Sequence, residues 1–229
     1  MTPPPVEGAG PCLLLFVKAP LPGHCKTRLA TSLGAKAAAE LAAAFVNDGS
    51  TNLQAWYGAR MLVCEHAEAA HPLLARLLAE EGWGHLPLSR APLGALMGAA
   101  FQQSFRAGFR PVLAVGADMP DLTAEDLVPA LRSLGRQDAV LGPSMDGGYY
   151  LLGLKAWIPE VFVDIPWSTP RTLTITLERL RDAGHTFDLL PVRRDIDTPE
   201  DLLKFLGDPR RMRCAPRTVQ AARRAGLAG

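Results

Sequence analysis

The fold of this chain is indicated most clearly by residues 111–122, which read PVLAVGADMPDL. The run 112–115 is short, aliphatic and followed by small residues, which is typical of a strand buried on both faces of a sheet. Asp118 comes just beyond the strand, and ligands of open α/β sheets bind outside the carboxyl ends of strands. The position therefore favours a carboxylate that faces a site. The alternative is that Asp118 or Asp121 caps the next helix, because Asp is a preferred N-cap residue.

Length and composition are those of an ordinary globular protein. The chain has 229 residues, of which 48% are hydrophobic and 21% charged, and this length favours one large domain. Its 24 basic and 23 acidic residues leave a net charge of +1, so we expect no nucleic-acid or membrane partner. The four cysteines have no zinc-ligand spacing. The apolar run 13–17 is too short for a signal-peptide core or a membrane span, so we expect a cytoplasmic protein.

Short apolar runs alternate with helical segments along the chain. Strands are predicted at residues 13–17, 60–64, 111–116, 137–141 and 186–191. Helices are predicted at residues 29–55, 72–81, 93–109, 124–134 and 171–183 and from Pro199, with a turn at 82–85. This alternation predicts an α/β fold, a three-layer sandwich in which a mostly parallel, Rossmann-like sheet lies between two layers of helices.

The ends of the chain differ in composition from its centre. Residues 1–11 are rich in Pro and Gly and are predicted to be a disordered tail. Residues 208–229 are rich in arginine and are predicted to be a basic C-terminal tail, either a solvated helix face or a frayed end. The region between them, residues 12–207, is predicted to form a single domain.

A basic loop follows the first predicted strand. Prolines and a glycine prevent regular structure before the helix that follows, and Lys18, Lys26 and Arg28 bring three positive charges. A loop at a helix amino terminus can present backbone N–H groups to an anion, so this loop favours phosphate binding. The spacing is not that of a Walker loop. The alternative is a surface turn with solvated basic residues.

Two further acidic segments follow predicted strands. Asp146, Gly147 and Gly148 form a strong turn signal, which could mark only a hairpin. In the functional alternative the glycines let a substrate approach the backbone, while Asp146 binds a hydroxyl group or a metal ion. Asp195 and Asp197 are two residues apart on an extended segment and therefore point the same way.

A parallel sheet brings the carboxyl ends of its strands to one edge, so these acidic segments and the basic loop should meet there. Carboxylates gathered in one place repel one another unless a cation intervenes, and hard oxygen ligands suit Mg²⁺ or Mn²⁺. A divalent ion flanked by Lys and Arg is what the phosphates of a nucleoside di- or triphosphate need during group transfer. The residues therefore predict a nucleotide-dependent transferase.

Five motifs also carry a family resemblance. They are KAPLPGHCKTRL at 18–29, GADMPDL at 116–122, LGPSMDGGYY at 141–150, WST at 167–169 and DIDT at 195–198. In this order, over about residues 12–206, the chain resembles a bacterial domain-of-unknown-function family whose members are commonly named as glycosyltransferases associated with radical-SAM enzymes or arsenosugar biosynthesis. That family is similar to the GT-A nucleotide-diphospho-sugar transferase superfamily, which includes 2-phospho-L-lactate guanylyltransferase and the molybdenum cofactor guanylyltransferases.

The resemblance implies a GT-A fold and a role for each motif. It implies that nucleotide phosphates are bound by Lys18, Pro22, Gly23, Lys26, Thr27 and Arg28. It implies that Asp118 and Asp197 hold Mg²⁺ or Mn²⁺, and that the acceptor is bound by Asp146, Gly147, Gly148, Tyr149, Trp167 and Ser168. Asp118, Asp146 and Lys26 are the expected catalytic residues, whereas Asp121 is expected to cap a helix.

Three functions remain open from the sequence. The first is a metal-dependent glycosyltransferase that moves a sugar from a nucleotide-diphospho-sugar to a small acceptor. The second is a nucleotidylyltransferase of the guanylyltransferase type that joins an NTP to a phosphorylated small molecule, which the paired charges of Lys26 and Arg28 favour. The third is a non-catalytic nucleotide- or partner-binding protein. It is motivated by residues 91–97, where the chain has APLGALM and family members often have GDLGERM.

Overall fold

The computed structural model describes residues 10–227, so the tail predicted at residues 1–11 lies almost entirely outside the described residues. Helices and strands alternate over this range as the sequence predicts. Within the described part of the chain, no helix combines the length and the apolar character needed to cross a membrane.

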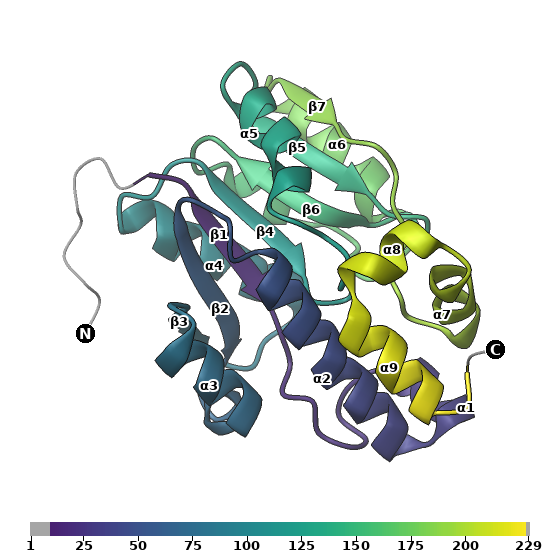
Figure 1. Cartoon of the computed structure of the whole chain (residues 1–229). Coiled ribbons are helices and arrows are strands. Elements are labelled where there is room, and N and C mark those ends of the chain that lie inside the picture. The colour runs from purple at the N-terminus through teal and green to yellow at the C-terminus, as the bar shows by residue number, and fades with distance from the viewer. Residues whose placement is uncertain (1–9, 228–229) are drawn as a thin grey trace.

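Seven strands form one mostly parallel sheet (Figure 1). The sheet has the order β3-β2-β1-β4-β6-β5-β7, and β6 is antiparallel to both of its neighbours. The strands are β1 (Cys12–Phe16), β2 (Ala59–Glu65), β3 (Gly84–Leu88), β4 (Val112–Gly116), β5 (Ala139–Pro143), β6 (Tyr149–Leu154) and β7 (Phe187–Leu189). At the centre, Phe16 of β1 pairs with Val63 of β2 and Gly116 of β4, so these parallel strands end at one edge.

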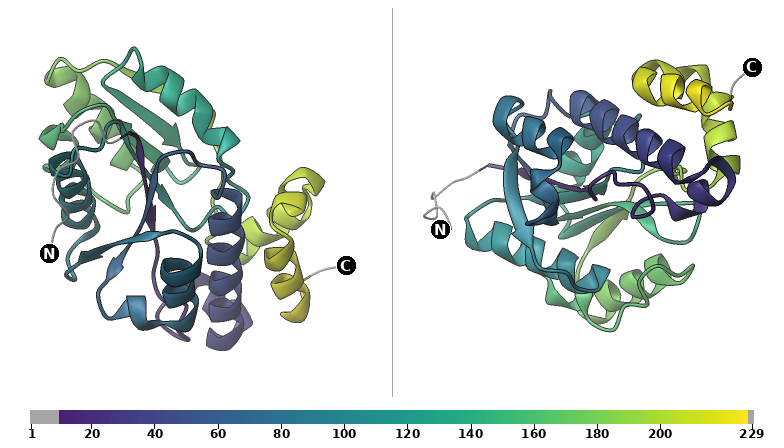
Figure 2. Two further views of the ribbon diagram at one scale, coloured as in Figure 1. Left: turned by 60° about the vertical axis from the view of Figure 1, so that its left-hand side comes forward. Right: turned by 90° about the horizontal axis from the view of Figure 1, so that it is seen from below.

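The helices cover both faces of the sheet. They are α1 (Thr27–Leu33), α2 (Ala35–Asn52), α3 (Pro72–Glu80), α4 (Leu93–Arg106), α5 (Val128–Leu134), α6 (Thr172–Asp182), α7 (Pro199–Leu206), α8 (Pro209–Cys214) and α9 (Pro216–Arg224). Over residues 10–227, three short 3₁₀ helices, η1 (Glu68–Ala70), η2 (Glu125–Leu127) and η3 (Pro159–Phe162), lie between them. Figure 2 shows the sheet as the middle layer between two groups of helices.

The alternation of side chains along β1 explains the two layers. Leu13 and Leu15 belong to a core cluster with residues of α2, α3 and α5. Cys12 and Leu14 belong to a second cluster with residues of α4 and α6. Because successive side chains of a strand point to opposite faces, a strand that is apolar at every position is buried on both. The predicted three-layer α/β sandwich is confirmed.

Two element predictions need correction. The helix predicted at residues 29–55 is divided into α1 and α2 at Gly34, whose φ of 84° lies in a region that glycine adopts without strain. Residues 84–88 were expected to begin with a turn but form β3, which pairs with β2 at the edge of the sheet. The helix predicted from Pro199 is α7, and Thr198 and Asp201 form a capping box at its start.

The carboxyl-terminal segment is folded rather than a tail. Helices α8 and α9 lie beside α2 (Figure 1), and Ala222 of α9 packs in a cluster with Phe45 of α2 and Phe205 of α7. Asp48 of α2 is buried and accepts hydrogen bonds from the backbone N–H of Thr218 at 2.7 Å and of Arg217 at 3.3 Å. The arginines of α9 therefore lie on a helix whose other face is apolar and buried.

Asp121 has a different role from the predicted cap. Its carboxylate accepts hydrogen bonds from Nε and one terminal nitrogen of Arg211 at 2.8 and 2.9 Å, and the Asp121 side chain is 8% exposed. The same arginine donates to the backbone oxygen of Arg194 at 2.9 Å. Arg211 of α8 therefore joins the loop after β4 to the segment before α7.

Candidate active site

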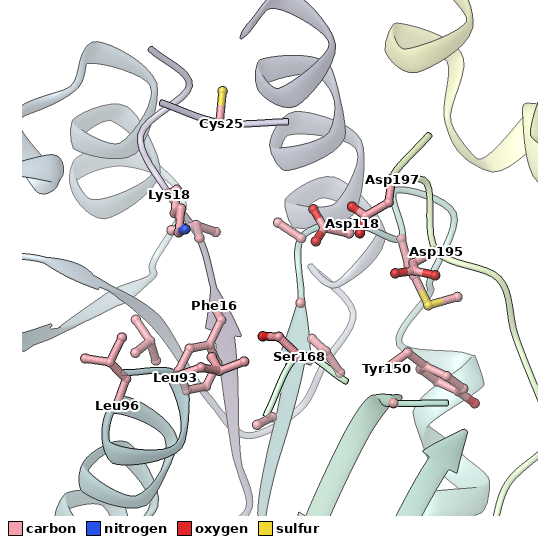
Figure 3. Close-up of a pocket in the computed structure, with 18 of the residues that line it drawn as sticks. Phe16, Lys18, Cys25, Leu93, Leu96, Asp118, Tyr150, Ser168, Asp195 and Asp197 are labelled. Carbon is pink, nitrogen blue, oxygen red and sulfur yellow. The ribbon is translucent and has the colours of Figure 1, made fainter. Parts of the chain in front are cut away.

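A cavity of about 640 Å³ opens at the carboxyl ends of β1, β2 and β4 (Figure 3). Its volume falls in the range of small-molecule sites. The walls come from the basic loop after β1, the start of α4, the loop after β4, the β5–β6 turn, the loop before α6 and the segment 193–197. The topology thus gathers segments that are far apart in the sequence at one edge of the sheet.

Lys26 is the central charged residue of this cavity. Its Nζ lies 2.6 Å from Oδ1 of Asp118 and 2.8 Å from Oδ1 of Asp197, and it donates a hydrogen bond of 2.7 Å to the backbone oxygen of Ile196. The Lys26 side chain is 7% exposed. Its backbone is left-handed, with φ of 45° just before α1, a conformation that is uncommon outside glycine and that concentrates at functional sites.

The two carboxylates keep Lys26 charged. Burial lowers the pKa of the Lys26 ammonium, but the negative charges of Asp118 and Asp197 raise it by more, so the net pKa lies above the usual value. A backbone hydrogen bond of 3.0 Å from Ile196 N–H to the oxygen of Asp118 holds the two acidic loops together. One ammonium group therefore neutralises two carboxylates that would otherwise repel each other.

A further carboxylate lies next to this group. Burial, followed by the charges of Asp197 and Asp146, raises the pKa of Asp195 to about 6. Asp195, Asp146, Asp118 and Asp197 all line the cavity, so the three acidic segments meet at one place. Local negative charge there exceeds what Lys26 alone balances.

A divalent cation fits this donor set under one condition. Oxygen atoms of Asp118 and Asp197 surround a single point, which is the arrangement that Mg²⁺ or Mn²⁺ uses with carboxylates and water. In the structure that point is held by the Lys26 ammonium, so a metal ion there requires Lys26 to withdraw. Among residues 10–227, no group of three or more His, Cys, Asp or Glu side chains is arranged to hold a metal ion.

In the turn at Asp146, one glycine packs against a neighbouring loop and the other lines the cavity. Oδ1 of Asp146 accepts hydrogen bonds from the Ser144 hydroxyl and from the Gly148 N–H, the latter at 2.9 Å. Gly147 has φ of 87°, and a Cβ there would lie 2.2 Å from the oxygen of Pro170. Gly148 lines the cavity, whereas Gly147 does not. Gly147 therefore serves the packing of two loops.

Two aromatic residues form a wall of the cavity. Tyr149 and Trp167 contact each other edge to face, with ring centroids 6.0 Å apart. The Trp167 indole lies against Gly94 of α4, where a Cβ would be 2.0 Å from its Nε1. Burial raises the pKa of the Tyr149 hydroxyl, so this group stays protonated at neutral pH. Ser168, also in the wall, has a left-handed backbone with φ of 59°.

The basic loop contributes only part of its predicted residues. Lys18, Thr27 and Arg28 line the cavity together with Lys26, but Pro22 and Gly23 do not. The Arg28 side chain is 71% exposed, and its guanidinium lies 3.7 Å from Oδ2 of Asp197. Cys25 is buried in this loop, and burial raises the pKa of its thiol, which opposes a role as nucleophile.

Apolar residues of the cavity are absent from the sequence-based prediction. They include Phe16, Leu88, Leu93, Leu96 and Met97, and Figure 3 shows Phe16, Leu93 and Leu96 at the side away from the carboxylates. The one signal in the sequence was the segment 91–97, where apolar residues replace the charged residues of the family motif. Hydrophobic residues in a helical pattern are otherwise indistinguishable from core.

Solved structures support the same architecture. A protein of Desulfovibrio desulfuricans G20, provisionally named a nucleotide-diphospho-sugar transferase, is 31% identical, with 95% of this chain and 96% of that chain covered and a TM-score of 0.85. The inositol-1-phosphate CTP transferase of T. maritima is 14% identical over 98% of this chain and 100% of that chain, with a TM-score of 0.53. Rv0371C from Mycobacterium tuberculosis H37Rv, solved in complex with manganese, is 13% identical over 89% of this chain and 100% of that chain, with a TM-score of 0.54. The last two show likeness of fold alone.

The fold and the charged cavity together place this protein in the class of nucleotide-dependent transferases. Residues 50–169 match the model of a family described as "Uncharacterized protein conserved in bacteria (DUF2064)". The chain belongs to this bacterial family. No protein of curated function matches the chain at a significant level.

Proposed function

We propose that the chain is a metal-dependent glycosyltransferase that moves a sugar from a nucleotide-diphospho-sugar to a small acceptor. The observation that carries this proposal is the cluster in which Lys26 contacts both Asp118 and Asp197 within 2.8 Å. Such a cluster can bind a cation with its carboxylates and a phosphate with its ammonium. The similarity to the Desulfovibrio protein supports a nucleotide sugar as the donor.

The basic residues around the cavity would bind the phosphates. Lys18 and Arg28 are exposed and can contact a diphosphate without losing a buried partner. Lys26 can turn its ammonium from the carboxylates to a phosphate oxygen, since both are anionic acceptors. As the bond from the anomeric carbon to the diphosphate breaks, charge builds on the phosphate oxygens, and these cations stabilise it.

Asp118 and Asp197 would hold Mg²⁺ or Mn²⁺ once Lys26 has withdrawn. When bound, the ion supplies Lewis-acid neutralisation of the leaving diphosphate. Asp146 or Asp195 would bind the acceptor hydroxyl, since both carboxylates line the cavity beside Asp118 and Asp197. Tyr149, Trp167 and Ser168 would form the wall against which the acceptor lies.

Calorimetry with nucleotides tests the proposal directly. We expect UDP, GDP, CDP or ADP to bind with Mg²⁺ or Mn²⁺, and Asp118→Asn to weaken that binding at least tenfold. Asp182→Asn is the matched control, because Asp182 is exposed at the end of α6, away from the cavity. The proposal fails if no nucleotide binds with either metal, or if Asp118→Asn and the control behave alike.

A second candidate is a nucleotidylyltransferase that joins an NTP to a phosphorylated small molecule. It is favoured by the positive charge at the cavity, where Lys18, Lys26 and Arg28 are all present and a triphosphate needs more neutralisation than a diphosphate. The two activities differ in their products. Release of pyrophosphate from an NTP together with sugar phosphates or phosphorylated acids supports the nucleotidylyltransferase, and release of a nucleoside diphosphate supports the glycosyltransferase.

A further inference from the structure

The cavity has two chemically different ends. Carboxylates and the buried Lys26 lie at the side of β4 and segment 193–197, as described above. At the opposite side lie the carbon side chains of Phe16, Leu93 and Leu96 (Figure 3). Both ends belong to the same cavity of about 640 Å³. A molecule or pair of molecules that fills it must present charge at one end and hydrocarbon at the other.

The apolar end is accessible rather than part of the core. Leu93 is 42% exposed although it is a large hydrophobic residue, and Phe16 and Leu96 are only partly buried. The residues further along α4, such as Phe101, are fully buried against the sheet. Contiguous apolar surface that stays accessible in a cleft is a mark of ligand-binding grooves.

A rigid aromatic wall connects the two ends. Trp167 lines the cavity, rests on Gly94 and contacts Tyr149 edge to face. Any side chain at residue 94 would collide with the indole, since its Cβ would be 2.0 Å from Nε1. An indole face held in this way can stack on a planar or alicyclic group.

A nucleobase fits the apolar end poorly. Ring nitrogens and exocyclic groups of a base need hydrogen-bond partners, and a site that selects a base supplies them. The side chains of Phe16, Leu93 and Leu96 at the apolar end offer only carbon. Polar groups suited to a base line the cavity at the ends of β1 and β2, where Lys18 and Glu65 lie.

We propose that the apolar end binds a hydrophobic group, an aromatic ring or a branched aliphatic chain, of the second substrate. This inference rests on the proposed function and deepens it by naming the class of acceptor: an amphiphilic small molecule with a hydrocarbon body against Leu93, Leu96 and Trp167. Its polar head is a hydroxyl group near Asp146 or a phosphate near the basic loop. A free polyol or an unsubstituted sugar lacks the body that this surface binds.

Calorimetry with paired probes tests the inference. The probes are benzyl alcohol and benzyl phosphate, compared with glycerol and glycerol 3-phosphate, each with and without a saturating nucleotide and Mg²⁺. We expect the benzyl compounds to bind at least tenfold more tightly than their glycerol counterparts and to bind while the nucleotide is present. Leu96→Asp should lower benzyl affinity at least tenfold, and the uncharged Leu96→Ala should leave nucleotide affinity within twofold.

Two further variants guard against loss of folding as the cause. Leu96→Ala removes carbon surface without adding charge, and we expect a smaller loss of benzyl affinity in the same direction. Leu203→Asp adds the same charge at a leucine that is 55% exposed on α7, outside the cavity, and should change neither affinity.

The outcomes distinguish failure of the acceptor inference from failure of the proposed function. If nucleotides bind with metal but the benzyl compounds bind no better than glycerol, the inference is overturned and the proposed function stands. Displacement of the benzyl compounds by the nucleotide, or loss of nucleotide affinity in the uncharged Leu96→Ala, also overturns it, because the apolar end would then hold the base. If no nucleotide binds, the proposed function fails and this inference fails with it.

Discussion

Replacing Lys26 by methionine should increase the affinity of the protein for Mn²⁺ in the absence of a nucleotide. Methionine keeps an unbranched apolar stem of similar length but removes the ammonium that lies 2.6 Å from Asp118 and 2.8 Å from Asp197. The two carboxylates then face each other with their repulsion uncompensated. A divalent cation no longer has to displace a competing positive charge.

The size of the effect follows from the geometry. At about 3 Å a pair of unit charges interacts by roughly 5 kcal/mol at an effective dielectric constant of about 20 and by about 1.4 kcal/mol in water. Asp118 is 50% exposed and Asp197 is 37% exposed, so solvent screening brings each pair close to the lower figure. About 1.4 kcal/mol corresponds to a tenfold change in affinity, and Lys26→Met removes two such pairs, so Mn²⁺ binding should strengthen about tenfold or more.

Calorimetric titration of MnCl₂ into the apoprotein measures this change, and thermal unfolding adds a second readout. Without metal, Lys26→Met should unfold at a lower temperature than the native protein, and added Mn²⁺ should raise its unfolding temperature more. Lys36→Met, at an exposed lysine of α2, is the control for loss of one positive charge. Equal or weaker Mn²⁺ binding by Lys26→Met would refute the view that the ammonium and the metal compete for one site.

Three further changes probe the loops around the site. Arg211→Ala should lower the free energy of unfolding by roughly 2–4 kcal/mol, because it leaves a buried carboxylate unpaired, and Arg211→Lys should recover only part of the loss in denaturant titrations. Burial opposes ionisation of Asp126, but hydrogen bonds from Thr123 and the charge of Arg193 hold its pKa below the usual value. The ionised Asp126 should therefore contribute its full stabilisation above about pH 4 and lose it as the pH falls further. In acid unfolding, the stability of Asp126→Asn should depend less steeply on pH than that of the native protein. Gly94→Ala should displace the Trp167 indole, which a shift of tryptophan fluorescence and weaker benzyl binding would report, while unchanged spectra would contradict the packing argument.

The fold could be predicted because its determinants are local. The central strands β1 and β4 are continuous apolar runs, and each is followed by turn residues and a helical pattern. A parallel sheet covered on both faces follows from that alternation alone. The edge strand β3 could not be predicted in this way, because its sequence contains Gly84 and Pro87, and pairing with β2 on one side decides its conformation.

The meeting of charged segments could be inferred from strand ends, but their contacts could not. Lys26 and Asp197 are separated by 171 residues, and the left-handed backbone at Lys26 that allows the contact leaves no mark in the sequence. Asp121 pairs with Arg211 from 90 residues away, so a carboxylate that reads as a helix cap is the anchor of a carboxyl-terminal helix. Such long-range ion pairs depend on how two loops approach each other in the folded chain, and the secondary-structure propensities of their residues do not determine this.

The position of Lys26 also bears on the order in which ligands bind. Because its pKa is raised by both neighbouring carboxylates, the ammonium stays protonated and its pair with Asp118 and Asp197 persists at neutral pH. A phosphate group is the competitor best suited to draw it away, since it offers the same charge-assisted hydrogen bonds. Nucleotide and metal should therefore bind with positive cooperativity, each making the site more favourable for the other by the same factor. In Lys26→Met the part of this coupling that comes from Lys26 should be lost, so the coupling should fall while metal affinity rises, a combination that loss of a simple phosphate ligand would not produce.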